Sequence, residues 1–138
     1  MKKIAALCLL LLSAPVMACS FKTMDTEKIR SIVRERGGYP VSDEICALLN
    51  KNGLSLKTSG HATVLDGVSV SWVEIRVWKN GVSSDHSRQD TTVNRNSASM
   101  VTAEDSLYKA IEKAVVQFDY KLATAEVDAY LAKNSKRK

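Results

Sequence analysis

The amino-acid sequence predicts a single α+β domain, in which two short N-terminal helices precede a three-stranded antiparallel meander and a long C-terminal helix packs on one face of that sheet. Two observations carry this prediction. Apolar residues repeat with the 3.6-residue period of a helix near both ends of the chain, and with the two-residue period of a strand in the middle. The dipeptides Asp66-Gly67 and Asn80-Gly81, which are typical of tight hairpins, divide that middle part into three strands.

The N-terminus has the pattern of a secretory signal peptide. A positive start, Lys2-Lys3, is followed by an apolar run over 4–12 and by mostly small residues over 13–18. We therefore expect residues 1–18 to be removed and residues 19–138 to form one domain with a basic C-terminal tail, in a periplasm or outside the cell. Removal of the two lysines lowers the formal charge from +5 to +3, which is too small an excess to indicate an acidic partner.

Cys19 allows two interpretations, and the sequence leaves both open. Cys19 and Cys46 are the two cysteines that remain after cleavage, and an even number in an oxidising compartment favours a disulfide between them. However, Val16-Met17-Ala18-Cys19 resembles the lipobox of bacterial lipoproteins, which implies a lipid on Cys19 and an outer-membrane anchor. Contact with a membrane is expected only in that second case.

Two short helices are expected before the sheet. Thr23 or Asp25 would cap a first helix that ends at Arg36, and Ser42 would cap a second helix over 43–51. The apolar residues that would face inward are Ile29, Ile32, Val33, Ile45, Leu48 and Leu49.

The first two strands are expected over 54–65 and 68–79, joined by the turn Asp66-Gly67. This turn sets the register, in which Leu65 faces Val68, Ala62 faces Ser71, Gly60 faces Val73 and Thr58 faces Ile75. One face then carries the residues on which the long helix should pack: Leu56, Ala62, Val64, Val73, Ile75 and Val77. The other face is too apolar to be covered by water alone, since it carries His61, Thr63, Val70, Trp72, Glu74, Arg76 and Trp78.

A third strand is expected to begin at Val82, after Asn80-Gly81, and its register places Asp85 opposite Arg76 in a cross-strand ion pair. The segment over 83–99 is almost entirely polar. It is therefore either an edge strand followed by a loop or one long loop. A long polar loop in a small domain is where we expect recognition.

The longest helical pattern covers residues 102–133, with Thr102 as its N-cap. Its inward stripe consists of Leu107, Ile111, Ala114, Val115, Phe118, Leu122, Ala125 and Ala129. Such a helix would be about 45 Å long against a domain diameter of roughly 35 Å, so it should overhang or bend. Its opposite side carries Val116, Tyr120, Val127 and Leu131, which either lie under the N-terminal helices or form a homodimer or partner interface.

No combination of residues predicts a catalytic site, a metal site or a cofactor. Asp85-His86-Ser87 has the residue types of a hydrolytic triad, but side chains adjacent in sequence rarely converge in the required relay. The two histidines, His61 and His86, lack further ligands at metal-binding spacing. The order helix, three strands, helix over 43–132 resembles the double-stranded RNA-binding topology, but the secretion signal argues against a nucleic-acid partner.

The function that fits these observations best is that of a non-enzymatic protein-binding module, such as an inhibitor or immunity protein, in the periplasm or secreted. Its contacts would come from the polar loop, with two tryptophans as anchors; the residues concerned are Trp72, Trp78, Asp85, His86, Arg88 and Asp90. An outer-membrane lipoprotein with a structural or assembly role and a small hydrolase are the alternatives.

Overall fold

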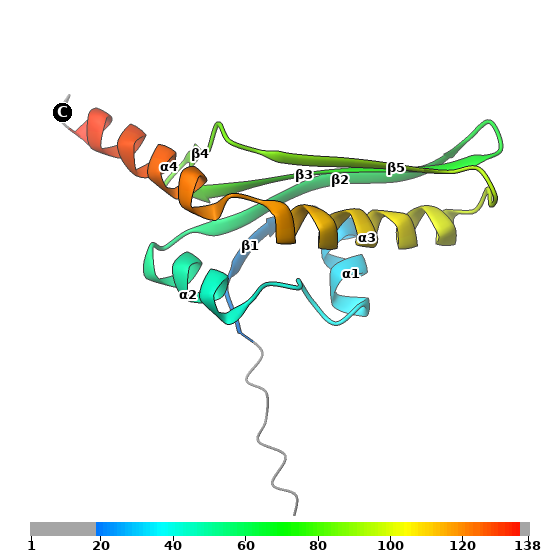
Figure 1. The fold of residues 1–138 in the computed structure, drawn as a ribbon, viewed down its shortest axis with the longest axis horizontal. Helices are drawn as coiled ribbons and strands as arrows, with labels where there is room; N and C mark the ends of the chain where they lie inside the picture. The colour runs from blue at the N-terminus through cyan, green and yellow to red at the C-terminus, as the bar shows by residue number, and fades with distance from the viewer. Residues whose placement is uncertain (1–18, 136–138) are drawn as a thin grey trace, which may run out of the picture.

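The computed structural model describes residues 19–135 (Figure 1). The elements follow in the order β1 (Lys22–Asp25), α1 (Glu27–Glu35), α2 (Asp43–Lys51), β2 (Ser55–Leu65), β3 (Val68–Lys79), β4 (Val82–Ser83), β5 (Arg88–Asn94), α3 (Met100–Gln117) and α4 (Tyr120–Ser135). The α+β class is confirmed. The predicted signal peptide and the last three residues of the basic tail lie outside the described residues.

The hairpin between β2 and β3 forms as predicted. The positive φ angles of Asp66 and Gly67, 46° and 79°, are those that a two-residue turn requires. All four predicted cross-strand pairs are present, from Leu65 with Val68 to Thr58 with Ile75. The turn residues therefore determine the register over the whole length of both strands.

The sheet is mixed, so the predicted purely antiparallel meander is wrong. β1 pairs in parallel with the first four residues of β2, from Lys22 with Ser55 to Asp25 with Thr58. A parallel pair needs a crossover connection, and α1 and α2 supply it. The hydroxyl of Tyr39, in the loop between these helices, lies 2.8 Å from the Asp25 carboxylate and 2.7 Å from the Thr58 hydroxyl, which fixes β1 against β2.

The first helix consequently starts later than predicted, because residues 22–25 belong to the sheet. Its N-cap is Thr26, whose side chain accepts a hydrogen bond from the Ile29 amide. Ser42 caps the second helix as predicted.

The predicted third strand is divided into β4 and β5, which both pair with β3 on the edge opposite β2. Between them, residues 84–87 leave the ladder but stay attached to β3. The buried Ser84 hydroxyl accepts a hydrogen bond from the Val77 amide and donates one to the His86 carbonyl at 2.7 Å. Most of the polar segment is therefore an ordered edge strand with one irregular step.

The predicted C-terminal helix is not continuous, because it divides into α3 and α4 at Phe118 and Asp119, and the bend expected from its length lies at this break. Phe118 has an extended backbone, with ψ of 134°, and the Asp119 carboxylate then accepts a hydrogen bond from the Leu122 amide at the start of α4. α3 begins two residues before Thr102, with Ser99 as its N-cap. Figure 1 shows α3 along the sheet and α4 set at an angle to α3, beside β4.

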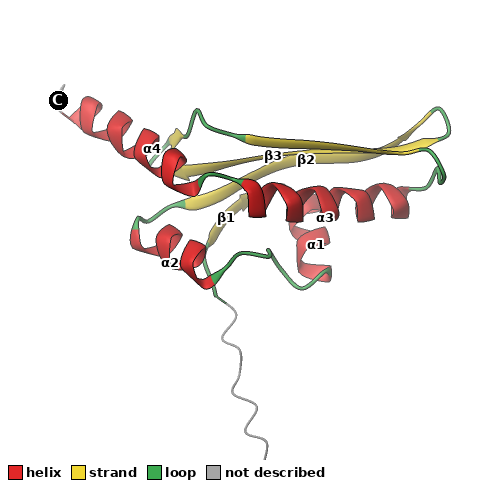
Figure 2. Cartoon of the chain, in the orientation of Figure 1, coloured by secondary structure: helices red, strands yellow, loops and turns green. Residues whose placement is uncertain are grey.

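Among the described residues, the helices lie on one side of the sheet and leave the other side uncovered (Figure 2). On the covered side, five of the six predicted core residues are buried, and Val64, near the hairpin turn, is half-buried. The uncovered side, which we call the open face, carries His61, Thr63, Leu65, Val68, Val70, Trp72, Glu74, Arg76, Gln89, Thr91 and Val93. The division of β2 and β3 into these two faces follows the predicted alternation.

Gly60 allows α3 to lie close to the sheet. A Cβ atom at this position would lie 2.6 Å from the Trp72 carbonyl oxygen and 3.3 Å from a methyl carbon of Leu107. We expect Gly60→Ala to lower the free energy of unfolding by about 1–3 kcal/mol, because the neighbouring backbone must move to relieve the clash.

Urea unfolding of the two proteins measures this difference. Ser59→Ala is the matched control, since Ser59 is adjacent in β2 and points to the open face, and it should change the stability by less than about 0.5 kcal/mol. Equal stabilities for Gly60→Ala and the control would contradict the tight contact between β2, β3 and α3.

Candidate functional site

The structure places four of the six predicted binding residues at the junction between the polar segment and the C-terminal helices. Asp85 and His86 lie in the irregular step between β4 and β5, whereas Arg88 and Asp90 lie in β5. Of the four, Asp85 is exposed and the other three are partly buried.

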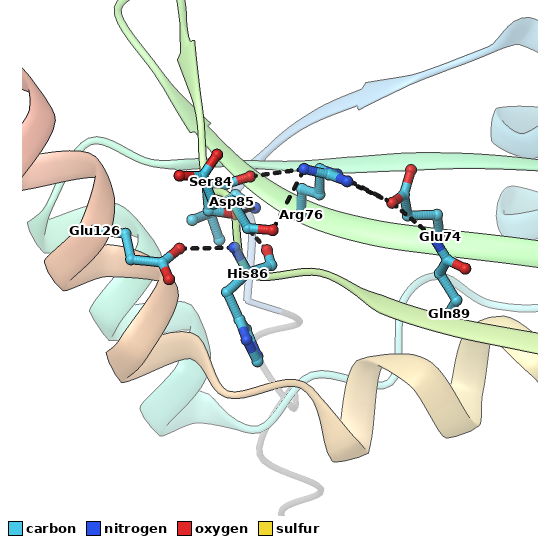
Figure 3. Close-up of polar contacts among 8 residues, drawn as sticks. Glu74, Arg76, Ser84, Asp85, His86, Gln89 and Glu126 are labelled. Carbon is cyan, nitrogen blue, oxygen red and sulfur yellow. Dashed lines mark hydrogen bonds and ion pairs between the residues drawn. The ribbon is translucent and has the colours of Figure 1, made fainter.

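His86 packs against the point at which the C-terminal helix divides. Its backbone N–H donates to the Glu126 carboxylate of α4 at 2.7 Å, as Figure 3 shows. Its imidazole ring lies 5.2 Å, between centroids, from the ring of Phe118, which in turn makes an edge contact with Tyr120 at 4.9 Å. These contacts pack the partly buried His86 against the aromatic rings at the division of the C-terminal helix.

Arg88 and Asp90 attach β5 to α3. The Arg88 guanidinium donates to the side-chain oxygen of Gln117 at the end of α3. The Asp90 carboxylate pairs with Lys113 at 2.9 Å and also accepts the Thr91 amide at 3.0 Å. The polar side chains of Arg88 and Asp90, which suggested recognition, thus bond to α3 within the same domain.

Arg76 does not pair with the Asp85 carboxylate, so that predicted ion pair is wrong. The guanidinium pairs instead with Glu74 at 2.7 Å, and it donates to the carbonyl oxygens of Ser84 at 3.0 Å and Asp85 at 3.5 Å (Figure 3). Gln89 donates to the same Glu74 oxygen at 3.0 Å. The hydrogen bonds from Arg76 and Gln89 lower the pKa of Glu74 below its usual value. Glu74, Arg76 and Gln89 thus form a polar row across the open face. Their hydrogen bonds go to one another and to backbone carbonyls of the same chain.

The two tryptophans differ in their surroundings. Trp78 is half-buried near the Asn80-Gly81 turn. Trp72 lies in the middle of the open face between His61 of β2 and Thr91 of β5, and 44% of its surface is exposed. Trp72 therefore remains available for contact.

Apolar residues surround Trp72 on the side toward the hairpin turn. Leu65 and Val93 are 56% and 51% exposed, while Val68 and Val70 are half-buried. We call Leu65, Val68, Val70, Trp72 and Val93 the apolar patch. Leu65 and Val93 were not among the predicted binding residues, although the predicted register already placed Leu65 beside Val68 at the end of the hairpin. Val93 joins the patch through its pairing with Val70, which the turn residues could not indicate.

The four residues proposed as a helix interface separate into two pairs. Tyr120 and Val127 are buried in the core at 5% and 1% exposure, so they offer no surface to another subunit. The Tyr120 hydroxyl donates to the Val115 carbonyl, and burial raises the pKa of this phenol well above its usual value. Leu131 packs partly against the core, whereas Val116 is 69% exposed beside a groove of about 420 Å³ between α2 and the end of α3.

The disulfide between Cys19 and Cys46 is present, with 6.2 Å between the two Cα atoms. It joins the segment before β1 to the buried face of α2. A disulfide of this kind fits an extracellular or periplasmic protein. It also occupies the Cys19 sulfur, which the lipobox interpretation would require for the lipid.

Within residues 19–135, no three side chains of histidine, cysteine, aspartate or glutamate are arranged to hold a metal ion. No helix in the same range is long and apolar enough to cross a bilayer. Comparison with known proteins yields no protein family, no curated protein and no solved structure that matches this chain.

Proposed function

We propose that this chain is a non-enzymatic protein-binding module that works in the periplasm or outside the cell, and that it binds its partner through the apolar patch on the open face. The observation that carries the proposal is a run of apolar side chains from Leu65 at the turn through Val70 and Val93 to Trp72, on a sheet face that no helix within residues 19–135 covers. Exposed tryptophans surrounded by aliphatic residues are typical of the centre of a protein interface.

The shape and borders of the patch favour a folded protein as the ligand. Small-molecule sites are usually concave, whereas the patch lies across adjacent strands of an open sheet. Glu74, Arg76 and Gln89 form a polar row along one side of it. An apolar centre beside a polar rim is the ordinary organisation of a protein interface, so the partner should present an apolar side chain to Trp72.

The rigidity of the scaffold supports a function as an inhibitor or immunity protein. The disulfide fixes the N-terminal segment, and the contacts of His86, Arg88 and Asp90 fix β5 against the helices. A surface that is ordered before binding loses little conformational entropy when the complex forms. We therefore extend the proposal to a partner that is a secreted or envelope-acting hydrolase, which this chain would block by covering its surface.

The experiment that tests this proposal compares Trp72→Ser with Tyr130→Ser. Tyr130 is a matched control, since it is 55% exposed but belongs to α4 and lies outside the open face. Immobilised mature protein is incubated with envelope and secreted fractions, and the stoichiometric partner is then purified for direct binding measurements. We expect Trp72→Ser to weaken binding at least about tenfold and Tyr130→Ser to leave it unchanged.

Equal binding by the wild-type protein and Trp72→Ser would overturn the assignment to the apolar patch. Inhibition of the purified partner's hydrolytic activity tests the finer proposal. A partner that binds at the patch and keeps full activity would contradict the inhibitor function but not the binding function.

A further inference from the structure

In the described part of the chain, one edge of the sheet is unpaired over most of the length of β2. β1 covers only the first four residues of β2, from Ser55 to Thr58, and the chain then turns away into α1. The remaining residues of the strand, 59–65, pair with β3 on one side only. A seven-residue strand edge is thus left next to the open face.

The backbone groups that this edge presents follow from the hairpin. Leu65 and Val68 flank a two-residue turn, so they exchange hydrogen bonds with each other, and the pattern then alternates along the ladder. The N–H and C=O groups of Val64, Ala62 and Gly60 consequently point away from β3. Within residues 19–135, no hydrogen bond from a turn, a loop or a side chain involves these three residues.

The other edge of the sheet has the protection that this one lacks. On β5, the Asp90 carboxylate covers the Thr91 amide and holds Lys113 beside the strand. In β2, residues 59–65 read Ser-Gly-His-Ala-Thr-Val-Leu, without a lysine, a carboxylate or a proline. An uncharged strand edge with free backbone groups is a site for pairing with another strand.

We propose that this edge pairs with the same edge of a second copy of the chain, antiparallel and centred on Ala62. In this register Ala62 lies opposite the partner's Ala62, and its outward backbone groups meet their equivalents. On either side of this central alanine pair a small residue faces a larger one, because Gly60 lies opposite the partner's Val64 and Ser59 opposite the partner's Leu65. The segment is self-complementary in size.

Seven residues lie between the end of β1 and the Asp66-Gly67 turn, so the ladder uses the whole free edge. The dimer would join the two open faces into one surface with two copies of Trp72. This inference does not depend on the proposed function, since the apolar patch could bind a partner from a monomer.

Sedimentation equilibrium of the mature, disulfide-bonded protein from about 1 µM to about 1 mM tests the association, because this range covers weak to moderate homodimers. The mass should rise from the monomer value toward twice that value. Thr63→Lys places a charge opposite the partner's His61, and we expect it to raise the dissociation constant at least about tenfold. Thr91→Lys is the matched control, since it makes the same change on the open face of the other edge strand and should not alter the dissociation constant.

A monomer mass at every concentration would overturn the proposal, and so would an equal effect of the two lysine variants. Circular dichroism of each variant confirms that the fold is kept.

A cysteine experiment tests the register. His61 lies opposite the partner's Thr63 in a pair whose Cα atoms are about 4.5 Å apart, close enough for a disulfide. The double variant His61→Cys with Thr63→Cys should form a covalent dimer in a glutathione buffer, and peptide mapping should join the two introduced sulfurs. Thr63→Cys alone should not form this covalent dimer. Each introduced sulfur would then lie opposite the partner's His61, two residues along the strand from the other introduced sulfur. A wild-type dimer whose double variant does not cross-link would reject this interface.

Discussion

Phe118→Ala is expected to lower the free energy of unfolding by about 3–5 kcal/mol, the usual cost of removing a buried phenylalanine. Phe118 is only 5% exposed, and its ring lies between the imidazole of His86 and the ring of Tyr120. Because the backbone is extended at this residue, the ring reaches the space between the start of α4 and residues 84–87, which join β4 to β5. Its removal would leave a cavity where three elements meet.

Urea unfolding gives the change in stability, and Val116→Ala is the matched control from the same turn of the helix. Val116 is 69% exposed, so its truncation should cost less than about 0.5 kcal/mol. Hydrogen exchange adds a local measurement, since the His86 amide, which donates to Glu126, should lose protection in Phe118→Ala. Similar stabilities for the two variants would show that Phe118 does not hold the two helices and the strand together.

The features that the sequence predicted correctly are those that neighbouring residues determine. Asp66-Gly67 needs positive φ angles at both positions, and this local requirement fixes the pairing from Leu65 with Val68 to Thr58 with Ile75. The alternation of apolar residues in β2 and β3 then assigns the two faces. Ser42 is a similar case, because a cap bonds to an amide only three residues away.

The division of the long helix could not be predicted from its apolar stripe, which continues through Phe118 and Leu122 without a proline or a glycine. Asp119 was a local signal for a new N-cap, but an aspartate within a helical pattern is not decisive. The contact that favours the extended conformation at Phe118 comes from His86, which is 32 positions earlier in the chain.

The candidate site shows the same limit. The polar composition of residues 83–99 indicated a loop, because the sequence does not reveal that Gln117, Lys113 and Glu126 would provide partners for Arg88, Asp90 and His86. Trp72 is exposed and lies opposite His61, where the hairpin register alone had placed it. Its neighbour Val93 required knowledge of how β5 pairs.

Replacement of both Cys19 and Cys46 by serine is expected to lower the free energy of unfolding by about 3.5 kcal/mol, the chain-entropy value for a loop closed over a separation of 27 residues. The effect should be greatest at the N-terminus. β1 has only four residues in its ladder with β2, and the segment before it is also held to α2 by the hydrogen bond from the Asn50 side chain to the Ser20 carbonyl at 2.9 Å.

Unfolding curves measured with and without a reductant distinguish the effect of losing the disulfide from the effect of the serine side chains. The reductant should destabilise the wild-type protein by nearly as much as the double replacement does, and it should leave the double variant unchanged. Hydrogen exchange should show that β1 loses protection before the long pair of β2 and β3, because that pair has eleven residue pairs and its own turn. Uniform loss of protection in all three strands would contradict this order and would mean that β1 unfolds only with the whole sheet.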